Sequence, residues 1–216
     1  MAALALLVLG GPLILVLAAL VKLTSRGPAF YTQKRLGRHG TSFTIYKLRT
    51  MVDRCESLTG PRWSLPGDPR VTGLGRFLRA SHLDELPQLL NVLRGDMSLI
   101  GPRPERPEFV PELEKALPGY WQRLTVRPGV TGLAQVQLPP DSDVTSVRRK
   151  LAHDLYYIER LGPWLDLRIL LCTALYAVGV GYDRLSRLVG TPGREAIEEA
   201  MGDAIGDAGP PARRSA

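Results

Sequence analysis

A chain of 216 residues, 44% of them hydrophobic, is long enough to bury the core of one domain without disulfide staples. Its formal net charge of +7 indicates an anionic partner, such as a membrane surface or a nucleic acid. The two cysteines, Cys55 and Cys172, lie far apart, which argues against a disulfide framework or a cysteine-based metal cluster and favours a reducing, cytosolic environment.

The first 21 residues are uncharged and almost wholly apolar. At about 1.5 Å per residue, a helix of this length could just cross a bilayer core of about 30 Å, so a spanning helix is the default prediction. The segment lacks the basic start and the cleavage site of a signal peptide. Pro12 follows Gly10 and Gly11 and removes an internal hydrogen bond. The alternative is therefore a helix that enters the membrane, breaks at Pro12 and returns to the same face.

Residues 22–52 contain no acidic residue. A basic block directly after an apolar segment is typical of the cytoplasmic surface of a membrane, where it meets anionic head groups. Nucleic acid is the alternative partner for such a block. The basic residues are Lys22, Arg26, Lys34, Arg35, Arg38, Lys47 and Arg49.

A β-hairpin is expected next, because residues 29–36 and 42–48 are rich in aromatic and β-branched residues and two glycines separate them. A short helix over residues 50–58 and a Gly- and Pro-rich loop over 59–69 follow. The remaining pattern is helical. Helices are expected over 71–80, over 112–124 with an interruption near 118–119, over 146–161, and over 164–182 as a core or interfacial helix.

Residues 84–94 are predicted to form one short helix with its chemistry at the front end. Pro87 falls in the first turn, where its missing N–H costs nothing, and Gly95 is a natural stop. Asp84 and Glu85 then lie at the positive end of the helix, where carboxylates stay ionised and phosphate can bind. A helical apolar face is expected from Leu86, Leu89, Leu90 and Leu93.

An N-cap is the ordinary explanation for an aspartate at a helix start. Three features favour a metal-and-phosphate site instead: the second carboxylate of Glu85, Arg79 shortly before it, and Arg103 in a rigid, proline-rich turn after it. Another glycine- and proline-containing turn, residues 126–136, holds Arg127. On spacing alone it is a weak candidate for a phosphate loop, since most such turns are only turns.

Six separated motifs, spanning about residues 12–176, together resemble the bacterial sugar transferases, the monotopic phosphoglycosyl transferases that act on polyprenyl phosphate. Any one of them alone would be weak, but the order and spacing of the set are highly specific. The motifs are KLRTM at 47–51, DPRVT at 68–72, LDELPQ at 83–88, GDMSLIGPRP at 95–104, RPGVTG at 127–132 and DLYYI at 154–158.

The resemblance refines the expected fold, which is mainly α with a short β-hairpin. It implies an N-terminal re-entrant helix broken at Pro12, with interfacial amphipathic helices around a compact cytoplasmic catalytic unit. We therefore expect a membrane-embedded helix over residues 1–23, a catalytic domain over 24–188 and a flexible tail over 189–216. The implied location is the cytoplasmic face of the bacterial inner membrane.

The resemblance also implies a reaction, in which a sugar-1-phosphate moves from a nucleotide sugar, usually a UDP-sugar, to undecaprenyl phosphate. The family uses an Asp-Glu dyad and Mg²⁺, which here correspond to Asp84 and Glu85 and a metal ion held at their end of the helix. We expect Asp84 to be the nucleophile, and Glu85 to bind metal or to receive the acceptor's proton. Arg79, Arg103 and Arg127 are expected to clamp phosphate oxygens, since a guanidinium matches them bidentately.

The expected partners are therefore a nucleotide sugar, undecaprenyl phosphate and membrane lipid, without nucleic acid; a homodimer is left open. Two alternatives explain part of the pattern. A membrane-tethered module that binds nucleic acid or lipid would account for the basic block and the apolar leader, but not for the paired acids among arginines. A nucleic-acid binder would lose affinity steeply with salt. An inactive scaffold of the same fold is the other alternative, against which the intact dyad argues.

Overall fold

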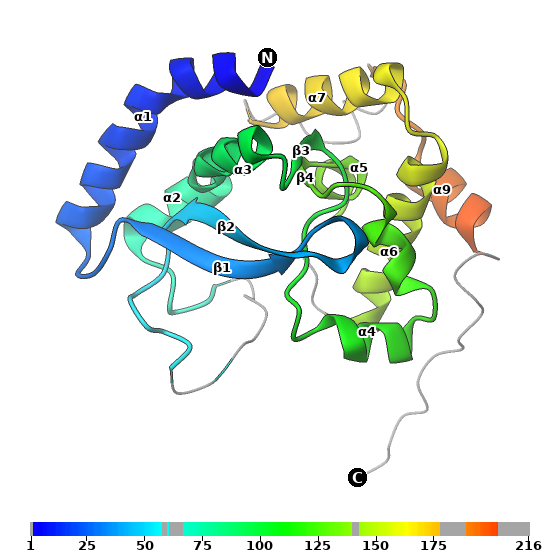
Figure 1. The fold of residues 1–216 in the computed structure, drawn as a ribbon, viewed down its shortest axis with the longest axis horizontal. Coiled ribbons are helices and arrows are strands. Elements are labelled where there is room, and N and C mark those ends of the chain that lie inside the picture. The colour runs from blue at the N-terminus through cyan, green and yellow to red at the C-terminus, as the bar shows by residue number, and fades with distance from the viewer. Residues whose placement is uncertain (1, 58–59, 61–66, 140–142, 178–188, 203–216) are drawn as a thin grey trace, which may run out of the picture.

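A computed structural model describes residues 2–57, 60, 67–139, 143–177 and 189–202. The apolar N-terminal segment forms one helix, α1 (Ala2–Thr24), and most of its leucine side chains are exposed. Figure 1 shows that α1 (blue) bends part-way along its length. Pro12 lies inside the helix and accounts for a bend, because it cannot donate the hydrogen bond to the preceding turn. Among the described helices, only α1 is long and apolar enough to cross a membrane.

The second half of α1 is docked on the rest of the molecule. Leu17 and Val21 are buried in a small apolar cluster with Leu48 and Leu78. These partners come from β2 (Ser42–Leu48) and from α2 (Gly73–Ala80), so the helix is tied to two separate parts of the chain. Burial of large aliphatic side chains stabilises such contacts by about 1.5–3 kcal/mol each.

The expected hairpin is confirmed. β1 (Phe30–Leu36) pairs antiparallel with β2, with Phe30 opposite Leu48 at the open end. Phe43 and Ile45 alternate along β2 with more exposed residues and pack on Met97. One face of the hairpin is therefore in the core, as the period of two along a strand requires.

The segment after β2 differs from the expected helix over residues 50–58. Its backbone starts out extended, because Met51 forms an isolated antiparallel bridge with Val71 and the amide of Val52 donates to the carbonyl of Arg70. These pairings use backbone groups that a helix would need for itself. Cys55 consequently lies in a turn, and residue 58 is outside the described residues.

The predicted single helix over residues 84–94 is two elements. Leu83–Gln88 form a 3-10 turn, η2, and the α-helix α3 covers only Leu89–Arg94. Pro87 explains the difference, because it supplies no N–H for an α-helical bond inside the first turns. Gly95, with φ of 84°, ends α3 as predicted.

A short parallel pair, β3 (Ser98–Ile100) and β4 (Gly129–Thr131), lies at the centre of the molecule. Two glycines allow their ends to approach. A Cβ on Gly101 would lie 2.5 Å from the carbonyl oxygen of Arg127, and one on Gly129 would lie 2.1 Å from the amide of Gly101. The predicted helix over 112–124 is interrupted as expected, by Gly119 with φ of 91°, between α4 (Val110–Ala116) and the 3-10 turn η3 (Tyr120–Thr125).

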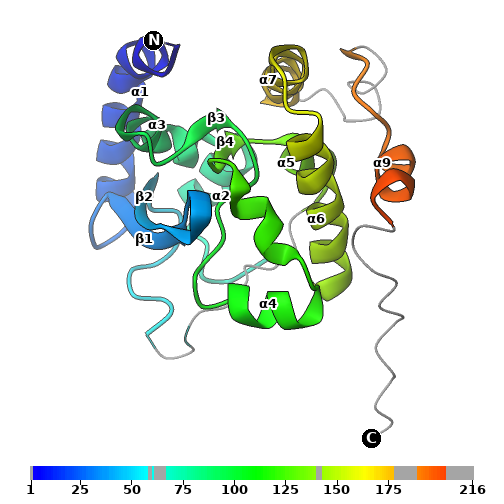
Figure 2. The ribbon, with the colours of Figure 1, turned by 45° about the vertical axis from the view of Figure 1, so that its right-hand side comes forward.

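The C-terminal helices lie on the side of β3 and β4 away from α1 and contribute much of the main core (Figure 2). They are α5 (Leu133–Gln137), α6 (Val144–Glu159), α7 (Pro163–Ala177) and α9 (Arg194–Met201). α9 differs from the flexible tail expected after residue 189, because it packs on α6 with Ile197 and Met201 buried. Residues 178–188 and 203–216, on which part of the expected last helix and tail fall, are outside the described residues.

Candidate active site

A cavity of about 800 Å³ opens beside η2. Its walls come from the hairpin, the segment after β2, η2 and the segment that follows β3. The cavity brings together four of the five residues expected to act on substrate, which are Arg79, Asp84, Glu85 and Arg103. A ligand pocket for a small organic molecule has a volume of about 300–1,000 Å³, so this cavity is large enough for a nucleotide sugar.

The Glu85 carboxylate pairs with two cationic side chains. Lys47 Nζ lies 2.7 Å from Oε1, and the Arg103 guanidinium donates to both carboxylate oxygens, with Nη1 3.1 Å from Oε2. Burial alone would raise the pKa of Glu85, but Arg103 and Lys47 outweigh it and hold this pKa far below its usual range. Glu85 also raises the pKa of Arg103, so both members of the pair stay charged at any ordinary pH.

Asp84 is the opposite case, although it is the adjacent residue. It is buried and lines the cavity, and among the described residues its carboxylate has no hydrogen-bond or ion-pair partner. Burial raises the pKa of Asp84, and the charge of Glu85 raises it further, against the opposing effects of Lys47, Arg103 and Arg79. A desolvated carboxylate that faces a cavity and carries no hydrogen bonds is suited to act as a nucleophile.

Arg79 approaches the cavity from the end of α2. Its Nε donates to the Thr50 hydroxyl at 2.9 Å, and the packing of α2 against the segment after β2 keeps it there. A Cβ on Gly75 would lie 2.0 Å from the Thr50 carbonyl oxygen, so only glycine permits this approach. The close packing of α2 therefore places a second guanidinium on the cavity wall beside that of Arg103.

Arg103 is held through its backbone as well as its side chain. The Arg103 carbonyl accepts a hydrogen bond from Arg123 Nη2 at 2.9 Å, and the next carbonyl, that of Pro104, accepts one from Arg35 Nη1 at 3.1 Å. Arg123 is itself fixed by Asp154 of α6, with Nε 3.0 Å from Oδ2. This buried support holds the Arg103 side chain on the cavity wall, in contact with Glu85.

Sequence reasoning missed three of these residues as members of the site: Lys47, Arg123 and Asp154. Lys47 and Asp154 lie within the motifs KLRTM and DLYYI, which is the only signal that could have drawn attention to them. Arg123 lies outside every motif. It acts through a backbone carbonyl twenty positions away, and no pattern of residue types records such a bond.

Arg127 is not brought to the cavity. It is exposed and is absent from the described residues that line the walls. Its motif instead supplies β4 and the glycines that pack against the end of β3, where the Gly101 amide donates to the Thr131 carbonyl. The RPGVTG motif therefore supports the segment that carries Arg103, which agrees with the interpretation of residues 126–136 as a turn rather than a phosphate loop.

The dyad can offer Mg²⁺ one carboxylate, not two. Both oxygens of Glu85 are occupied by cations, whereas the oxygens of Asp84 carry no such partner among the described residues. No group of three or more His, Cys, Asp or Glu side chains gathers anywhere in the part of the chain that the structure describes. Mg²⁺ is commonly bound by one or two carboxylates together with substrate phosphates, and Asp84 fits that pattern.

Known proteins resemble this chain over most of its length. The family model described as bacterial sugar transferase matches residues 1–179. A UDP-N-acetylgalactosamine-undecaprenyl-phosphate N-acetylgalactosaminephosphotransferase of Aeromonas hydrophila is 45% identical over 162 residues, which are 75% of this chain and 38% of the relative. A UDP-glucose:undecaprenyl-phosphate glucose-1-phosphate transferase of Caulobacter vibrioides is 47% identical over 164 residues, 75% of this chain and 61% of the relative.

An enzyme of the same name from Xanthomonas campestris pv. campestris is 41% identical over 170 residues, 78% of this chain and 35% of the relative. The chain thus aligns with about a third to three-fifths of the length of these curated relatives. The matched region includes the whole cavity and every motif quoted above. The chain belongs to the bacterial sugar transferase family.

Proposed function

We propose that the chain is a phosphoglycosyl transferase, which moves a sugar-1-phosphate from a UDP-sugar to undecaprenyl phosphate as the first membrane step of a surface polysaccharide or glycoconjugate pathway. One observation carries this proposal: Asp84 faces the cavity without a partner among the described residues, while the adjacent Glu85 binds two cations. The names of the relatives support the choice of donor and acceptor.

In the first step, an Asp84 carboxylate oxygen attacks the phosphorus that carries the sugar. The bond from that phosphorus to the bridging oxygen breaks, and the nucleoside monophosphate leaves with the electron pair. In the second step, a phosphate oxygen of undecaprenyl phosphate attacks the same phosphorus and the bond to Asp84 breaks, which restores the carboxylate. Two steps allow a soluble donor and a lipid acceptor to use the site in turn.

Glu85 is proposed to act by holding cations rather than by reacting. It fixes Arg103 and Lys47 on the wall of the cavity where the donor's diphosphate would lie, and Arg79 adds a further positive charge. Preorganised donors of this kind stabilise the charge that develops on the transferred phosphoryl group. In the same proposal Mg²⁺, bound by the diphosphate and Asp84, would offset the remaining negative charge.

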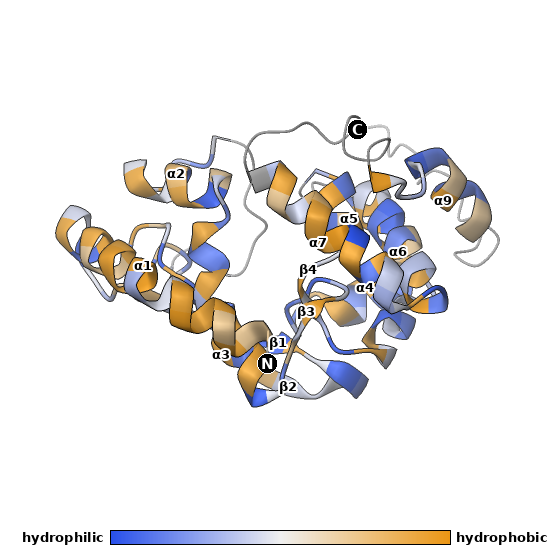
Figure 3. Cartoon of the chain, turned by 90° about the horizontal axis from the view of Figure 1, so that it is seen from above, coloured by the Kyte–Doolittle hydropathy of each residue, from blue (hydrophilic) through white to orange (hydrophobic). Residues whose placement is uncertain are grey.

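The exposed apolar surface supports a location at the membrane. In Figure 1 the start of α1 and the whole of α7 lie along the same edge of the molecule, and Figure 3 shows both helices rich in apolar residues when seen from that side. Trp164 and Leu171 of α7, and Leu90 and Leu93 of α3, are exposed as well. We propose that this edge lies in the cytoplasmic leaflet of the bacterial inner membrane, and that the bend of α1 at Pro12 makes it re-entrant.

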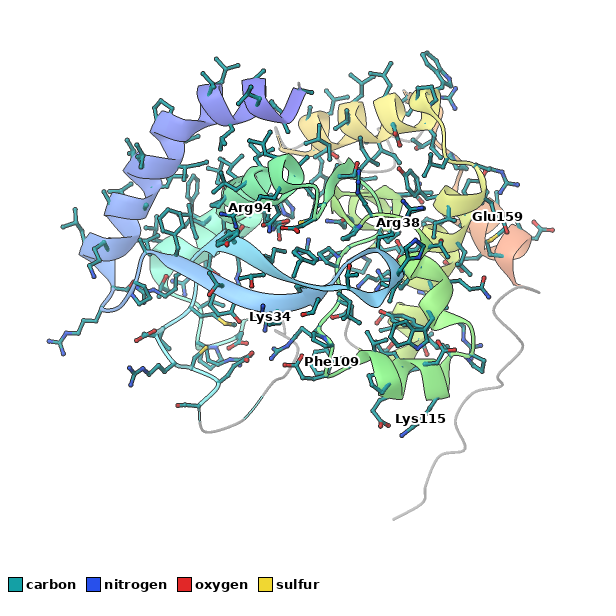
Figure 4. The ribbon with its side chains drawn as sticks, in the orientation of Figure 1. Lys34, Arg38, Arg94, Phe109, Lys115 and Glu159 are labelled. Atoms are coloured by element: carbon teal, nitrogen blue, oxygen red, sulfur yellow. The ribbon has the colours of Figure 1, made fainter. Side chains whose placement is uncertain are left out.

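Release of nucleoside monophosphate tests the proposal. Detergent-solubilised protein is incubated with Mg²⁺, undecaprenyl phosphate and each of a panel of UDP-sugars, and UMP is measured. The proposal expects UMP from at least one donor with the wild-type protein and with Glu159→Gln, but not with Asp84→Asn. Glu159 is exposed, lies on the side of the molecule opposite α1 (Figure 4), and is not among the described residues that line the cavity. No release from any donor would contradict it and favour a scaffold or binding role.

A further inference from the structure

The chain just after α1 is hydrogen-bonded to the catalytic unit through the side chain of Arg49. Arg49 is 5% exposed, and its guanidinium donates to three backbone carbonyls just beyond the helix: Nη2 to Ser25 at 3.0 Å, Nη1 to Arg26 at 2.6 Å and Nε to Pro28 at 2.6 Å. The Arg49 amide donates to a fourth, that of Ala29, at 2.9 Å. Carbonyls that follow a helix end have no partner within the helix, so Arg49 supplies what they lack.

The chain around Arg49 has little room to rearrange. The carbonyl between these, that of Gly27, accepts from Lys22 Nζ at 3.1 Å, so five successive carbonyls are bonded. Gly27 has φ of +113°, and a Cβ there would lie 2.9 Å from the Asp53 side chain and 3.3 Å from Arg49 Nη1. A side chain at position 27 would therefore disturb both the backbone and the contact with Arg49.

Arg49 also lies directly between two contacts of the active site. Two residues earlier, Lys47 reaches Glu85, and one residue later, the Thr50 hydroxyl accepts from Arg79. A stretch of four residues thus touches the end of α1, the dyad and a cavity arginine. The other contacts that hold α1 here, such as Leu17 and Val21 on Leu48, are apolar and non-directional, so they do not fix the depth of the helix by themselves.

We infer that Arg49 is a positioning residue that sets how deep the cavity lies relative to α1, and so relative to the membrane that α1 occupies. The inference rests on the proposed function, because its consequence concerns the two substrates. A UDP-sugar arrives from water and reacts with Asp84 whatever the depth of the cavity. The phosphate of a lipid acceptor is fixed at the bilayer surface, so it reaches the phosphosugar on Asp84 only when the cavity lies at the right height.

The test separates the two half-reactions in Arg49→Lys, which keeps the charge but can form fewer of the three side-chain bonds. In protein reconstituted in bilayer nanodiscs, we expect UMP formation in a single turnover without acceptor to stay within about threefold of wild type. Transfer to undecaprenyl phosphate should fall by about tenfold or more, since loss of positioning commonly costs that much. Gly27→Ala disturbs the same contact from the segment that accepts the Arg49 hydrogen bonds, and it should shift the same ratio.

Arg38→Lys is the matched control, because Arg38 Nε also donates to a backbone carbonyl, that of Thr125 at 3.0 Å, at the turn of the hairpin away from α1 (Figure 4). It should leave the ratio unchanged. If Arg49→Lys left the ratio of lipid transfer to UMP formation unchanged, whether or not both rates fell, the inference would be overturned.

Hydrogen exchange gives a readout that needs no activity. Amides of residues 22–30 should exchange faster in Arg49→Lys than in wild type or Arg38→Lys. Unchanged exchange there would overturn the anchoring role. A wild-type protein that forms no UMP, with the expected change in exchange, would contradict the proposed function and leave the anchor standing.

Discussion

Arg103 joins two buried clusters of cationic and carboxylate side chains. One cluster contacts its backbone carbonyl and the other its guanidinium, and only the second contains a carboxylate that has no partner among the described residues. In the first cluster, Arg123 is bonded by Asp154, the Tyr120 hydroxyl and the Arg103 carbonyl. In the second, Glu85 is bonded by Lys47 and the Arg103 side chain, but a second carboxylate, Asp84, has no partner among the described residues and faces the cavity.

The difference shows how to tell a structural ion pair from a reactive one. The Arg123 cluster is closed, since nearly every donor meets an acceptor, and breaking it leaves a buried charge uncompensated. The Asp84 cluster is open, because Lys47 and Arg103 bring positive charge to the wall of the cavity that Asp84 faces without a partner among the described residues. It is therefore arranged to receive a substrate that brings negative charge.

The largest effect is expected on the open side. Asp84→Asn should lower the turnover rate by about 10⁴-fold or more, because it removes the proposed nucleophile. The free energy of unfolding should stay the same or rise, since burial and Glu85 raise the pKa of Asp84 and its charge opposes folding at neutral pH. Turnover by UMP release and chemical denaturation on the same preparation check both parts. A loss of turnover that only follows a loss of folded protein would count against it.

The closed side should behave in the reverse way. Asp154→Ala should lower the free energy of unfolding by about 3–5 kcal/mol, because it leaves the Arg123 guanidinium buried without its counter-ion. Replacing both, in Arg123→Met with Asp154→Leu, should recover most of that loss. Denaturant titration measures it. A single variant as stable as wild type would show that the pair has no structural role.

The bond between the two clusters should give an intermediate effect. Arg103→Lys keeps the charge but loses the fork that meets both oxygens of Glu85, and we expect turnover to fall by about 10²-fold. Arg94→Lys is a suitable control, since the exposed Arg94 side chain contacts the ring and hydroxyl of Tyr46 and is not among the described residues that line the cavity. If both variants lost the same activity, the fork would not matter.

The pH dependence should report Asp84 directly. The proposed first step needs the ionised carboxylate, so activity should be present above the folded-state pKa of Asp84 and fall as pH drops through it. Because burial raises this pKa, the acid limb should lie above the pH at which an ordinary aspartate titrates. Lys47→Met should move the limb to higher pH, since Lys47 lowers this pKa. An unmoved limb in kcat/KM would assign it to another group.

The smallest effect is expected for Arg127. The side chain is exposed and does not line the cavity, so Arg127→Ala should change turnover by no more than about twofold. Steady-state kinetics with a saturating donor measures this. A loss comparable to that of Arg103→Lys would mean that Arg127 does bind phosphate, as its motif first suggested.

Local patterns predicted the elements whose cause is local. The hairpin, the stop at Gly95 and the interruption at Gly119 each depend on residues within a few positions, and each is confirmed. The same logic explains the error at residues 84–94. The α-helix is predicted to start at Asp84, but Pro87 lies in a 3-10 turn and the α-helix starts only at Leu89. α9 was missed because its two apolar anchors are spread thinly among charged residues.

The sequence alone predicts only part of the candidate site. The motifs indicate Asp84, Glu85 and Arg103, the position of Arg79 shortly before the acids adds a fourth residue, and the structure brings these four to one cavity. The contrast between the two acids depends on which one Lys47 reaches from 38 positions away. Neither residue type nor spacing encodes that choice, because it follows from how the hairpin packs on η2.

Asp84 is proposed to carry the sugar phosphate between the two substrates, and isotope exchange can test this claim without a lipid acceptor. Protein is incubated with a UDP-sugar donor, Mg²⁺ and labelled UMP, without any lipid acceptor, and label is followed into the UDP-sugar. A covalent phosphosugar on Asp84 predicts exchange by the wild type and none by Asp84→Asn. Exchange that appears only when undecaprenyl phosphate is added, in a preparation that completes the full transfer, would contradict the claim and show direct transfer between the substrates.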